Sequence, residues 1–328
     1  MIKKKLVGYM DKFPDFNSRG FDIDAYNKQF IESNMIIHAR AKEIAYPDHW
    51  GGLSVKCAFY GEEFYKSSNA LYAVDDQHYL VFNEGKYYSS WIESEQEVES
   101  FTVNITPEFA AEFFQSLHAS TTELLDNGNH LPRVEPIRFS EKLYHHNSLV
   151  TPVLHQIKHL SQQVKANHER ITESLFLLLQ RLYENQFSTN LEIESVQKCK
   201  ASTKAEIFER LTRAKDFIYS AYNTDITLAE IAEIACLNQF YFLRQFRKLY
   251  KTTPHQFLTQ RRMQVAAELL KQSKKNVVEI CGDVGFSDIA SFSKLFKRTF
   301  GLTPLQYRQQ HQASMSTCRG FPSALSIF

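Results

Sequence analysis

Two groups of cationic side chains near the C-terminus have the residue types and the spacing to bind anionic partners. Their members are Arg244, Arg247 and Lys248 in the first group and Lys294, Lys297 and Arg298 in the second. Residues three and four positions apart share one face of an α-helix, so each group would form a single cationic surface. A guanidinium offers paired N–H donors in a fixed fork, and an ammonium offers a compact positive charge. The expected chemistry is recognition of phosphates and of planar hydrogen-bond acceptors.

The charge of the chain is uneven, and both cationic groups lie in its basic part. The whole chain carries a formal net charge of +1. Residues 204–311 contain 17 basic and 10 acidic residues, a net charge of +7, and the remainder contains 21 basic and 27 acidic residues, a net charge of −6. A basic segment joined to an acidic one suggests a module that binds a polyanion, although unequal charge is also common in two-domain proteins without such a partner.

Length and composition limit the class of protein. At about 150 residues per domain, 328 residues predict two domains. Hydrophobic residues make up 43% and charged residues 23%, which excludes disorder as an overall description. No apolar stretch approaches the roughly 20 residues of a membrane helix, and the N-terminus lacks the apolar core of a secretory signal. The five scattered cysteines form no CxxC pair, so we expect a cytoplasmic protein without a membrane partner.

The elements that must position the cations occur twice. Residues 227–258 and 276–308 form an internal repeat, whose first parts align at an offset of 49 and whose second parts align at an offset of 50. Each copy predicts a helix of about eight residues, a tight turn and a second helix of about a dozen. This order of elements is the helix-turn-helix pattern.

Start signals mark the helices of both copies. Thr227 precedes Glu230 by three residues, as in a capping box, and Asn276 precedes Glu279 in the same way. A threonine also stands directly before a proline in each copy, which places a cap residue before the first helical position. Gly285 suits a sharp bend in the second turn.

The second helix of each copy has one apolar and one cationic face. The inward candidates are Phe242, Phe246 and Leu249 in the first copy and Phe292, Leu295, Phe296 and Phe300 in the second. An α-helix fits the major groove of DNA, where side chains reach base edges while flanking cations hold phosphates. Short helix pairs with solvated basic faces also occur in proteins that never bind DNA, but two capped and basic copies favour DNA.

Residues 210–308 resemble the DNA-binding domain of the AraC/XylS family of bacterial transcription regulators. The most specific part is VGFSDIASFSKLFKRTFGLTPLQYR (284–308), which is similar to the family pattern of Gly-Phe, Ser, Phe-Ser-Arg/Lys, Phe-Lys, Gly-x-Thr-Pro and Tyr-Arg. Two departures are Cys281, where the family usually has Ala, and the aromatic start Phe240-Tyr241-Phe242 of the first recognition helix. The resemblance implies a regulator, more commonly an activator, that binds double-stranded promoter DNA and acts with RNA polymerase.

The resemblance also implies roles for residues of the two recognition helices, which a long helix from Pro254 to about Lys271 would hold in adjacent major-groove segments. The base-facing candidates are Gln239, Phe240, Leu243 and Arg244 in the first helix and Ile289, Ala290, Ser293 and Lys294 in the second. The phosphate candidates are Arg247, Lys248, Lys297 and Arg298. Arg244 is the strongest candidate, because a guanidinium can bond two guanine acceptors, and its loss should cost about 1–3 kcal/mol. Phe240 and Ile289 could pack on thymine methyl groups or, alternatively, in the core.

The N-terminal half predicts a β-rich region followed by helices. Between residues 50 and 105, short runs rich in Val, Tyr, Phe and Ile are separated by turns such as Asn83-Glu84-Gly85, which is typical of a small antiparallel barrel or sandwich. Pro107 stands at the first position of a helix. Two apolar seams within 149–183 predict a helical hairpin that pairs inside a domain or with a second subunit, so we expect a homodimer through this segment.

These patterns predict an α+β chain of two domains. A small antiparallel β-barrel, cupin-like by the resemblance, would combine with the helical hairpin into an effector-sensing and dimerisation domain, and an all-α domain with two helix-turn-helix motifs would bind DNA. The predicted bounds are 1–184 for the first domain, 185–204 for a polar linker, 205–311 for the DNA-binding domain with motifs at about 227–250 and 276–300, and 312–328 for a tail without a clear signal.

A barrel of this kind could hold a small-molecule effector among aromatic side chains. The candidates are Trp50, Phe59, Tyr65, Tyr72, Tyr79, Tyr88 and Trp91. For any one of these rings, the alternative is that it fills the core of the barrel. The sequence identifies no ligand.

Enzymatic and metal chemistry find little support in the sequence. A metal-binding cupin needs a His-x-His pair, and neither His49 nor His78 has a second ligand at short spacing. His155 and His159 could share a metal on one helix face, yet such pairs more often face solvent or an interface. No Gly-rich phosphate loop or nucleophile arrangement is visible. We therefore expect no enzyme activity, metal or cofactor, and the alternatives are a helical protein-interaction module and a cupin-type metalloenzyme fused to a DNA reader.

Overall fold

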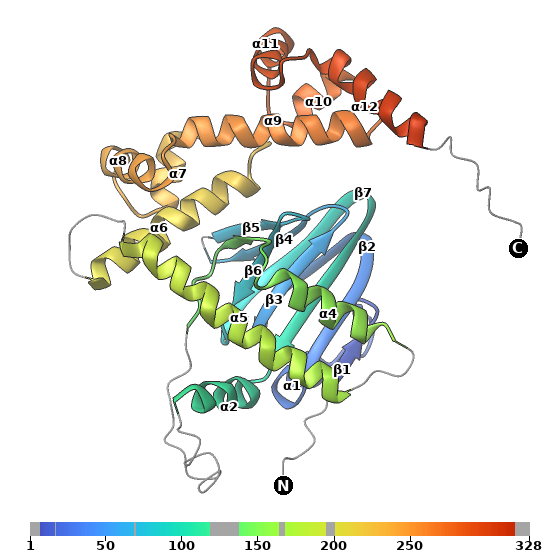
Figure 1. Ribbon diagram of the computed structural model, residues 1–328, viewed down its shortest axis with the longest axis vertical. Helices are drawn as coiled ribbons and strands as arrows, with labels where there is room; N and C mark the ends of the chain where they lie inside the picture. Colours follow the sequence, from blue (N-terminus) through green and yellow to red (C-terminus); the bar gives the residue numbers. More distant parts are fainter. Residues whose placement is uncertain are drawn as a thin grey trace, which may run out of the picture. The chain divides into compact units, whose positions relative to one another are not determined.

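The computed structural model describes residues 7–118 except 17 and 69, and residues 138–163, 168–194 and 201–318. They fall into two compact units that divide between Ser220 and Ala221 (Figure 1). The first unit is a sheet covered by helices, and the second consists of helices alone. None of the helices in the described part contains an apolar stretch long enough to cross a bilayer.

One mixed sheet forms the centre of the first unit. Its strands are β1 (Val7–Met10), β2 (Asn34–Gly51), β3 (Leu53–Phe59), β4 (Glu63–Ser67), β5 (Ala70–Val74), β6 (His78–Phe82), β7 (Lys86–Ile105) and β8 (Leu143–His145). They follow the order β1-β2-β7-β3-β6-β8, and β4 pairs with both β5 and β7. β1 runs parallel to β2, while the other pairs of described strands are antiparallel. Register shifts along the β2–β7 pair bend these two long strands.

The sheet is open, so the expected closed, cupin-like antiparallel barrel is not found among the described residues. At its two ends, β1 pairs with β2 and β8 pairs with β6, and no described pairing joins β1 to β8. β8 has three residues and β1 has four, which leaves little backbone for closure. The broader prediction of an α+β chain with a C-terminal helical domain is confirmed.

Turn signals located most of this sheet correctly. Gly85 has a φ of +82° in the turn between β6 and β7, as a tight hairpin requires. The runs expected as separate strands after this turn belong to one strand of 20 residues, β7. The elements before residue 50 were not predicted, and they are β1, the helix α1 (Ile23–Glu32) and most of β2.

Helices α2 (Pro107–His118), α4 (Thr151–Ser161) and α5 (His168–Glu194) pack on the apolar face of the sheet (Figure 1). α2 begins at Pro107, as predicted. The seams of the predicted hairpin are buried in this core through Val153, Leu154, Ile157, Leu160, Ile171, Leu175, Leu178, Leu179 and Leu182. Each fully buried aliphatic side chain contributes about 1.5–3 kcal/mol. Because the seams pack within the unit, they are not available to a second subunit.

The segment expected as a polar linker, 185–204, is helical where the structure describes it. α5 continues to Glu194, and α6 (Ala201–Ser220) already includes residues 201–204. Two polar side chains in this part of α5 make tertiary hydrogen bonds: the Asn185 amide donates to the Tyr79 hydroxyl at 3.1 Å, and the Gln186 amide donates to Ser140 Oγ at 3.2 Å. At Asn185 and Gln186, the polarity that suggested a linker reflects tertiary hydrogen bonds. Residues 195–200 lie outside the described residues.

Helix α6 belongs to the first unit, so the division between the units lies 16 residues after the expected start of the DNA-binding domain at 205. The helix packs against β5. Two of its polar groups accept hydrogen bonds from the backbone: the Asp216 carboxylate from the Leu143 N–H at 3.0 Å, and the Ser220 hydroxyl from the Ala73 N–H at 2.7 Å. The different functions expected of the two domains remain predictions.

The second unit contains the two predicted helix-turn-helix motifs. Its helices are α7 (Leu228–Ile234), α8 (Gln239–Tyr250), α9 (Pro254–Gln272), α10 (Val277–Asp283), α11 (Ile289–Phe300) and α12 (Pro304–Cys318). α7 and α8 form the first motif, α10 and α11 form the second, and the long α9 joins them (Figure 1). α12 covers the first part of the segment expected as a tail, and residues 319–328 lie outside the described residues.

The structure contains the predicted helix caps and explains the change of offset within the repeat. Thr227 and Asn276 form the predicted capping boxes, and Thr253 forms a third at the start of α9. The turn between the helices has four residues in the first motif, 235–238, and five in the second, 284–288. This extra residue explains the change of offset from 49 to 50.

Candidate nucleic-acid interface

Two buried phenylalanines fix the rotation of α8. Phe242 and Phe246 have no exposed surface. The Phe246 ring lies 4.7 Å from Tyr250 and 6.2 Å from Phe257 of α9, measured between centroids. Asn238 caps the helix by accepting a hydrogen bond from the Tyr241 N–H. With this face held inward, the opposite face of α8 is presented to solvent.

Helix α11 is held in the same way. Phe292 and Phe296 are fully buried, and they join Met263 and Leu270 of α9 in one hydrophobic cluster. Asp288 caps the helix by accepting from the N–H groups of its first turn. Both recognition helices are therefore positioned by an N-terminal cap and by pairs of phenylalanines four residues apart.

Most of the predicted base-facing residues lie on the exposed faces. Gln239, Phe240, Arg244, Ile289, Ala290 and Lys294 are exposed, while Leu243 and Ser293 are half-buried. Phe240 is 88% exposed and Ile289 is 38% exposed, so the alternative that these two residues belong to the core is wrong. The predicted phosphate-binding residues are also exposed, and they are Arg247, Lys248, Lys297 and Arg298. Contact of these side chains with DNA remains a prediction.

Arg244 is oriented by its own helix. Its guanidinium carbon lies 5.5 Å from the centroid of the Tyr241 ring, within cation–π range. Such a contact limits the conformations of a long side chain, which reduces the entropy lost when the guanidinium binds a partner. The aromatic start of α8, noted in the sequence as a departure, thus provides a neighbour for Arg244.

Arg262 of α9 contacts two separate segments of the second unit. Its Nε donates to the carbonyl of Tyr222 at 2.7 Å, and its Nη2 donates to the carbonyl of Thr224 at 2.9 Å. The same guanidinium lies 5.4 Å from the centroid of Phe286, in the turn of the second motif. The chain entering the first motif is therefore linked through one side chain to the turn of the second.

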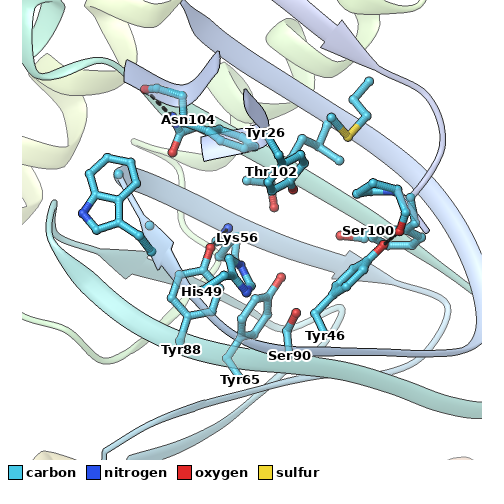
Figure 2. A pocket seen from close by; sticks show the side chains of 18 of the residues that line it. Tyr26, Tyr46, His49, Lys56, Tyr65, Tyr88, Ser90, Ser100, Thr102 and Asn104 are labelled. Atoms are coloured by element: carbon cyan, nitrogen blue, oxygen red, sulfur yellow. Dashed lines mark hydrogen bonds between the residues drawn. The ribbon is translucent and has the colours of Figure 1, made fainter. Parts of the chain in front are cut away.

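The first unit contains a pocket on the face of the sheet opposite α2, α4 and α5, and Tyr26 and Phe30 of α1 contribute to its lining. Side chains alternate along β7, so Phe101, Val103 and Ile105 enter the hydrophobic core, while Ser100, Thr102 and Asn104 line the pocket. Figure 2 shows these polar side chains around the same space as Lys56, Tyr65 and Tyr88. The cavity between the lining residues has a volume of about 40 Å³, and it opens to solvent.

Three of the seven predicted effector residues line this pocket, namely Trp50, Tyr65 and Tyr88. The other four do not. Phe59 packs at the main core, and Tyr79 belongs to that core. Tyr72 donates to the carbonyl of Glu141, and Trp91 stacks on Phe64 with centroids 5.4 Å apart. Phe59 and Tyr79 therefore fit the alternative prediction, in which the ring fills the core. Side chains alternate along a strand, and these two point to the face that the helices cover.

Ionisable side chains that were not among the predicted effector residues also line the pocket. Lys56 Nζ donates to the Tyr88 hydroxyl at 2.8 Å. Burial lowers the pKa of Lys56 to about 8, while burial raises the pKa of Glu63, and each charge partly offsets the effect on the other. Burial also lowers the pKa of His49, which keeps that ring neutral near pH 7.

A signal for this polar face was present in the sequence. SFTVNI at 100–105 alternates strictly between polar and apolar residues, and SVKC at 54–57 does the same. Such alternation predicts two faces of different character, but a polar face is ordinarily assigned to solvent. Here Lys56 is 6% exposed and Thr102 is 3% exposed, so the polar face is buried.

The described residues contain no cluster of three or more His, Cys, Asp or Glu side chains that could hold a metal ion. His155 and His159 both lie on the exposed side of α4.

Comparison with known proteins places the second unit in a family. Residues 231–310 match a family model described as a helix-turn-helix domain. The Msm operon regulatory protein of Streptococcus mutans is 31% identical over 138 residues, which cover 42% of this chain and 46% of that protein. The RCS-specific HTH-type transcriptional activator RclR of Escherichia coli is 38% identical over 84 residues, which cover 26% of this chain and 30% of that protein. The chain thus spans less than half the length of these curated relatives.

A solved structure is similar over the same region. It is a transcriptional regulator from Chromobacterium violaceum, described as an AraC-type DNA-binding domain-containing protein, with 26% identity over 31% of this chain and 91% of that one and a TM-score of 0.30. The matched region coincides with the capped and repeated helix pairs. The second unit is therefore an AraC-type helix-turn-helix domain, similar to those of HTH-type transcription regulators.

Proposed function

We propose that this protein activates transcription by placing α8 and α11 in adjacent major-groove segments of promoter DNA. The observation that carries the proposal is the outward face of each recognition helix, which exposes cations while phenylalanines hold the opposite face. Because α9 has 19 residues, its length is about 28 Å, comparable with the roughly 34 Å of one DNA turn. That similarity suits two helices reading the same side of one duplex.

The exposed side chains divide into base readers and phosphate binders. Arg244 would bond the O6 and N7 acceptors of one guanine, and Gln239 would bond adenine. Phe240, Ile289 and Ala290 would contact thymine methyl groups, while Leu243, Ser293 and Lys294 complete the two reading faces. The predicted phosphate partners, Arg247, Lys248, Lys297 and Arg298, would hold the register without reading sequence.

The first unit would act as the sensor that controls DNA binding. Its pocket carries buried polar groups beside aromatic rings, the composition of a small-molecule site. A role as activator is supported by the similarity to RclR, which is named a transcriptional activator, and contact with RNA polymerase is what the family resemblance implies. A homodimer through 149–183 would have to use the outer faces of α4 and α5, because their apolar seams are buried. Light scattering of the full chain at micromolar concentration tests this part: a monomer contradicts it.

The DNA-reading role of Arg244 is tested by selection on a randomised operator library. We expect Arg244→Ala to relax the preference at one guanine and to weaken binding by about 1–3 kcal/mol. The matched control is Lys248→Ala on the same helix, which should weaken binding to all sequences equally and flatten the salt dependence. Base preferences that Arg244→Ala leaves unchanged would reject the assignment.

A further inference from the structure

Three segments of the second unit meet at Arg262. They are α9 itself, the turn of the second motif, and the turn at 221–226 through which the chain enters the first motif, here called the entry turn. The guanidinium donates to the carbonyls of Tyr222 and Thr224 in the entry turn, and it lies 5.4 Å from the ring centroid of Phe286 in the second motif. Two N–H donors in a rigid fork fix the direction of the guanidinium plane as well as its position. Arg262 therefore holds both turns on one helix.

The backbones of the two turns also approach each other closely. Gly285 has a φ of +78°, and a Cβ added there would lie 3.0 Å from the carbonyl oxygen of Asn223 in the entry turn. This approach is closer than ordinary van der Waals contact, so glycine suits the position both by its conformation and by its lack of a side chain. Tyr222 and Phe286 pack against the same hydrophobic cluster, which α9, α10 and α11 form. The entry to the first motif is thus packed against the second motif.

These contacts extend to both recognition helices. The centroid of Phe286 lies 5.6 Å from that of Phe292, the buried ring that fixes the rotation of α11. The entry turn leads directly to Thr227, which caps α7. The first motif is also attached to the start of α9, where Phe257 packs on Phe246 of α8. Attachment at two separate points of α9 restricts the rotation of the first motif about the axis of that helix, and Arg262 provides one of the two.

The spacing of two DNA segments depends on distance and on rotation together. One base pair added between them moves the segments about 3.4 Å further apart and rotates them by about 35° around the duplex axis. A rigid pair of recognition helices fits one spacing only, whereas a pair that can rotate about α9 can adapt to others. The preference for spacing therefore measures how firmly the two motifs are held relative to each other.

We propose that Arg262 is a positioning residue that sets the spacing between the two operator segments. It contacts no base. It holds the entry turn and the turn of the second motif in one arrangement on α9, and in this way it fixes α8 relative to α11. The inference rests on the proposed function, in which these two helices read adjacent segments of one duplex, and it names the side chain that determines their separation.

Operators of altered spacing test this role in the full chain. The probes are the operator selected by the wild-type protein and two derivatives with one base pair added or removed between the segments. The boundary of the segments lies between the base positions whose preference changes in Arg244→Ala and in Lys294→Ala. Affinities are measured at one fixed salt concentration. We expect the wild-type protein to bind both derivatives about 30-fold more weakly, because only one recognition helix can then contact its bases fully.

Arg262→Gln removes the charged fork and should lower this spacing penalty. Its affinity for the selected operator should fall by about tenfold, because the arrangement that fits the operator is no longer held. Its affinity for the two derivatives should stay close to that of the wild-type protein, so the penalty falls to about threefold. Arg262→Lys keeps the charge without the fork and should show a penalty of about tenfold. This milder change also tests the proposal if Arg262→Gln folds poorly.

Val265→Ala is the matched control on the same helix. Val265 is buried in the cluster of the second motif, so its truncation lowers stability and leaves the fork of Arg262 in place. It should weaken binding to all three operators by the same factor. Circular dichroism of each variant at the assay temperature verifies that the protein is folded.

The outcomes distinguish this inference from the proposed function. If both Arg262 variants weaken binding but keep the full wild-type spacing penalty, the residue supports the fold alone; the inference is overturned and the proposed function stands. If the wild-type protein binds all three operators equally, or selects no operator, the two helices do not read one duplex together and both are overturned. A spacing penalty that falls in Val265→Ala as far as in Arg262→Gln also overturns the inference, because any loss of stability would then have the same effect.

Discussion

The two helix-turn-helix motifs share an inner architecture and differ in outer chemistry. Each recognition helix buries two phenylalanines four residues apart, Phe242 and Phe246 in α8 and Phe292 and Phe296 in α11. The outward cations also occupy corresponding positions, but the kind of cation and the uncharged residues beside them differ. α8 presents an amide, a phenyl ring and a guanidinium, whereas α11 presents Ile289, a methyl group and an ammonium.

This difference indicates which positions the fold determines and which are free to set function. Packing against α9 requires large apolar side chains at fixed positions, so the inner faces match. Solvent imposes no such requirement on the outer faces. On the proposed function, the first motif therefore discriminates bases more strongly, because a guanidinium and an amide can each make two bonds to one base edge.

The largest effect is expected from the shared inner face. Phe246→Ala and Phe296→Ala should each lower the free energy of unfolding of the second unit by about 3–5 kcal/mol, through lost burial and a residual cavity. Both tryptophans, Trp50 and Trp91, lie in the first unit, so hydrogen exchange of the α8 and α11 amides is the appropriate measurement. Phe240→Ala is the control, and it should change stability by less than about 0.5 kcal/mol. If either core substitution has only a small effect on stability, the two motifs are not stabilised by their phenylalanines in the same way.

The turns provide the next largest contrast. Gly285 has a φ of +78°, and an added Cβ would lie 2.9 Å from the Arg262 guanidinium and 3.0 Å from the Asn223 carbonyl oxygen. Gly285→Ala should therefore destabilise the second motif by about 3 kcal/mol, combining backbone strain with displacement of Arg262. Faster hydrogen exchange of the α10 and α11 amides would show this destabilisation. Gly282→Ala on α10 is the matched control, because nothing lies within 4 Å of its added Cβ; comparable exchange in both variants would argue against the strain.

Exchanging the two outward cations sharpens the functional comparison. Arg244→Lys should lose about 2 kcal/mol of discrimination at one guanine, since an ammonium cannot form the fork of two bonds. Lys294→Arg should leave the first half of the operator unchanged and add a guanine preference in the second half. Sequencing of selected operators measures both. If the two swaps alter the same operator position, the assignment of one helix to each groove segment is wrong.

The smallest expected effect is at the first turn. Cys236 is exposed and has a φ of +50°, where Gly285 stands in the second motif. Cys236→Gly should stabilise the first motif by about 0.5 kcal/mol, because glycine adopts this conformation without strain although it also gains entropy in the unfolded chain. Slower hydrogen exchange of the α7 and α8 amides would show this stabilisation. Destabilisation would mean that side-chain contacts of Cys236 outweigh the backbone term.

The sequence predicted the second unit well because its signals are local. Caps such as Thr227 and Asn276 act within four residues, and the spacing of phenylalanines directly defines the inner face. The resemblance added the identity of the recognition helices. The exposure of Phe240 could not be decided in advance, because an aromatic residue on a short helix is compatible with both the core and the surface.

The first unit was predicted less completely because its features depend on distant contacts. The polar residues from Asn185 onward appeared solvated, yet Asn185 bonds to Tyr79, more than 100 residues earlier. The alternation of β7 identified two faces without showing that the polar one is buried around Lys56. The openness of the sheet depends on which strand ends meet, a property that no local pattern contains.

The anchoring of α6 connects the sheet around the pocket to the last residue of the first unit through few residues. Tyr65, which lines the pocket on β4, is the cross-strand partner of Tyr72 on β5, and the next residue, Ala73, bonds to Ser220. Ser220 is followed directly by the first residue of the second unit. On the proposed sensor function, a ligand that displaced β4 would act on this junction through two paired strands and one hydroxyl.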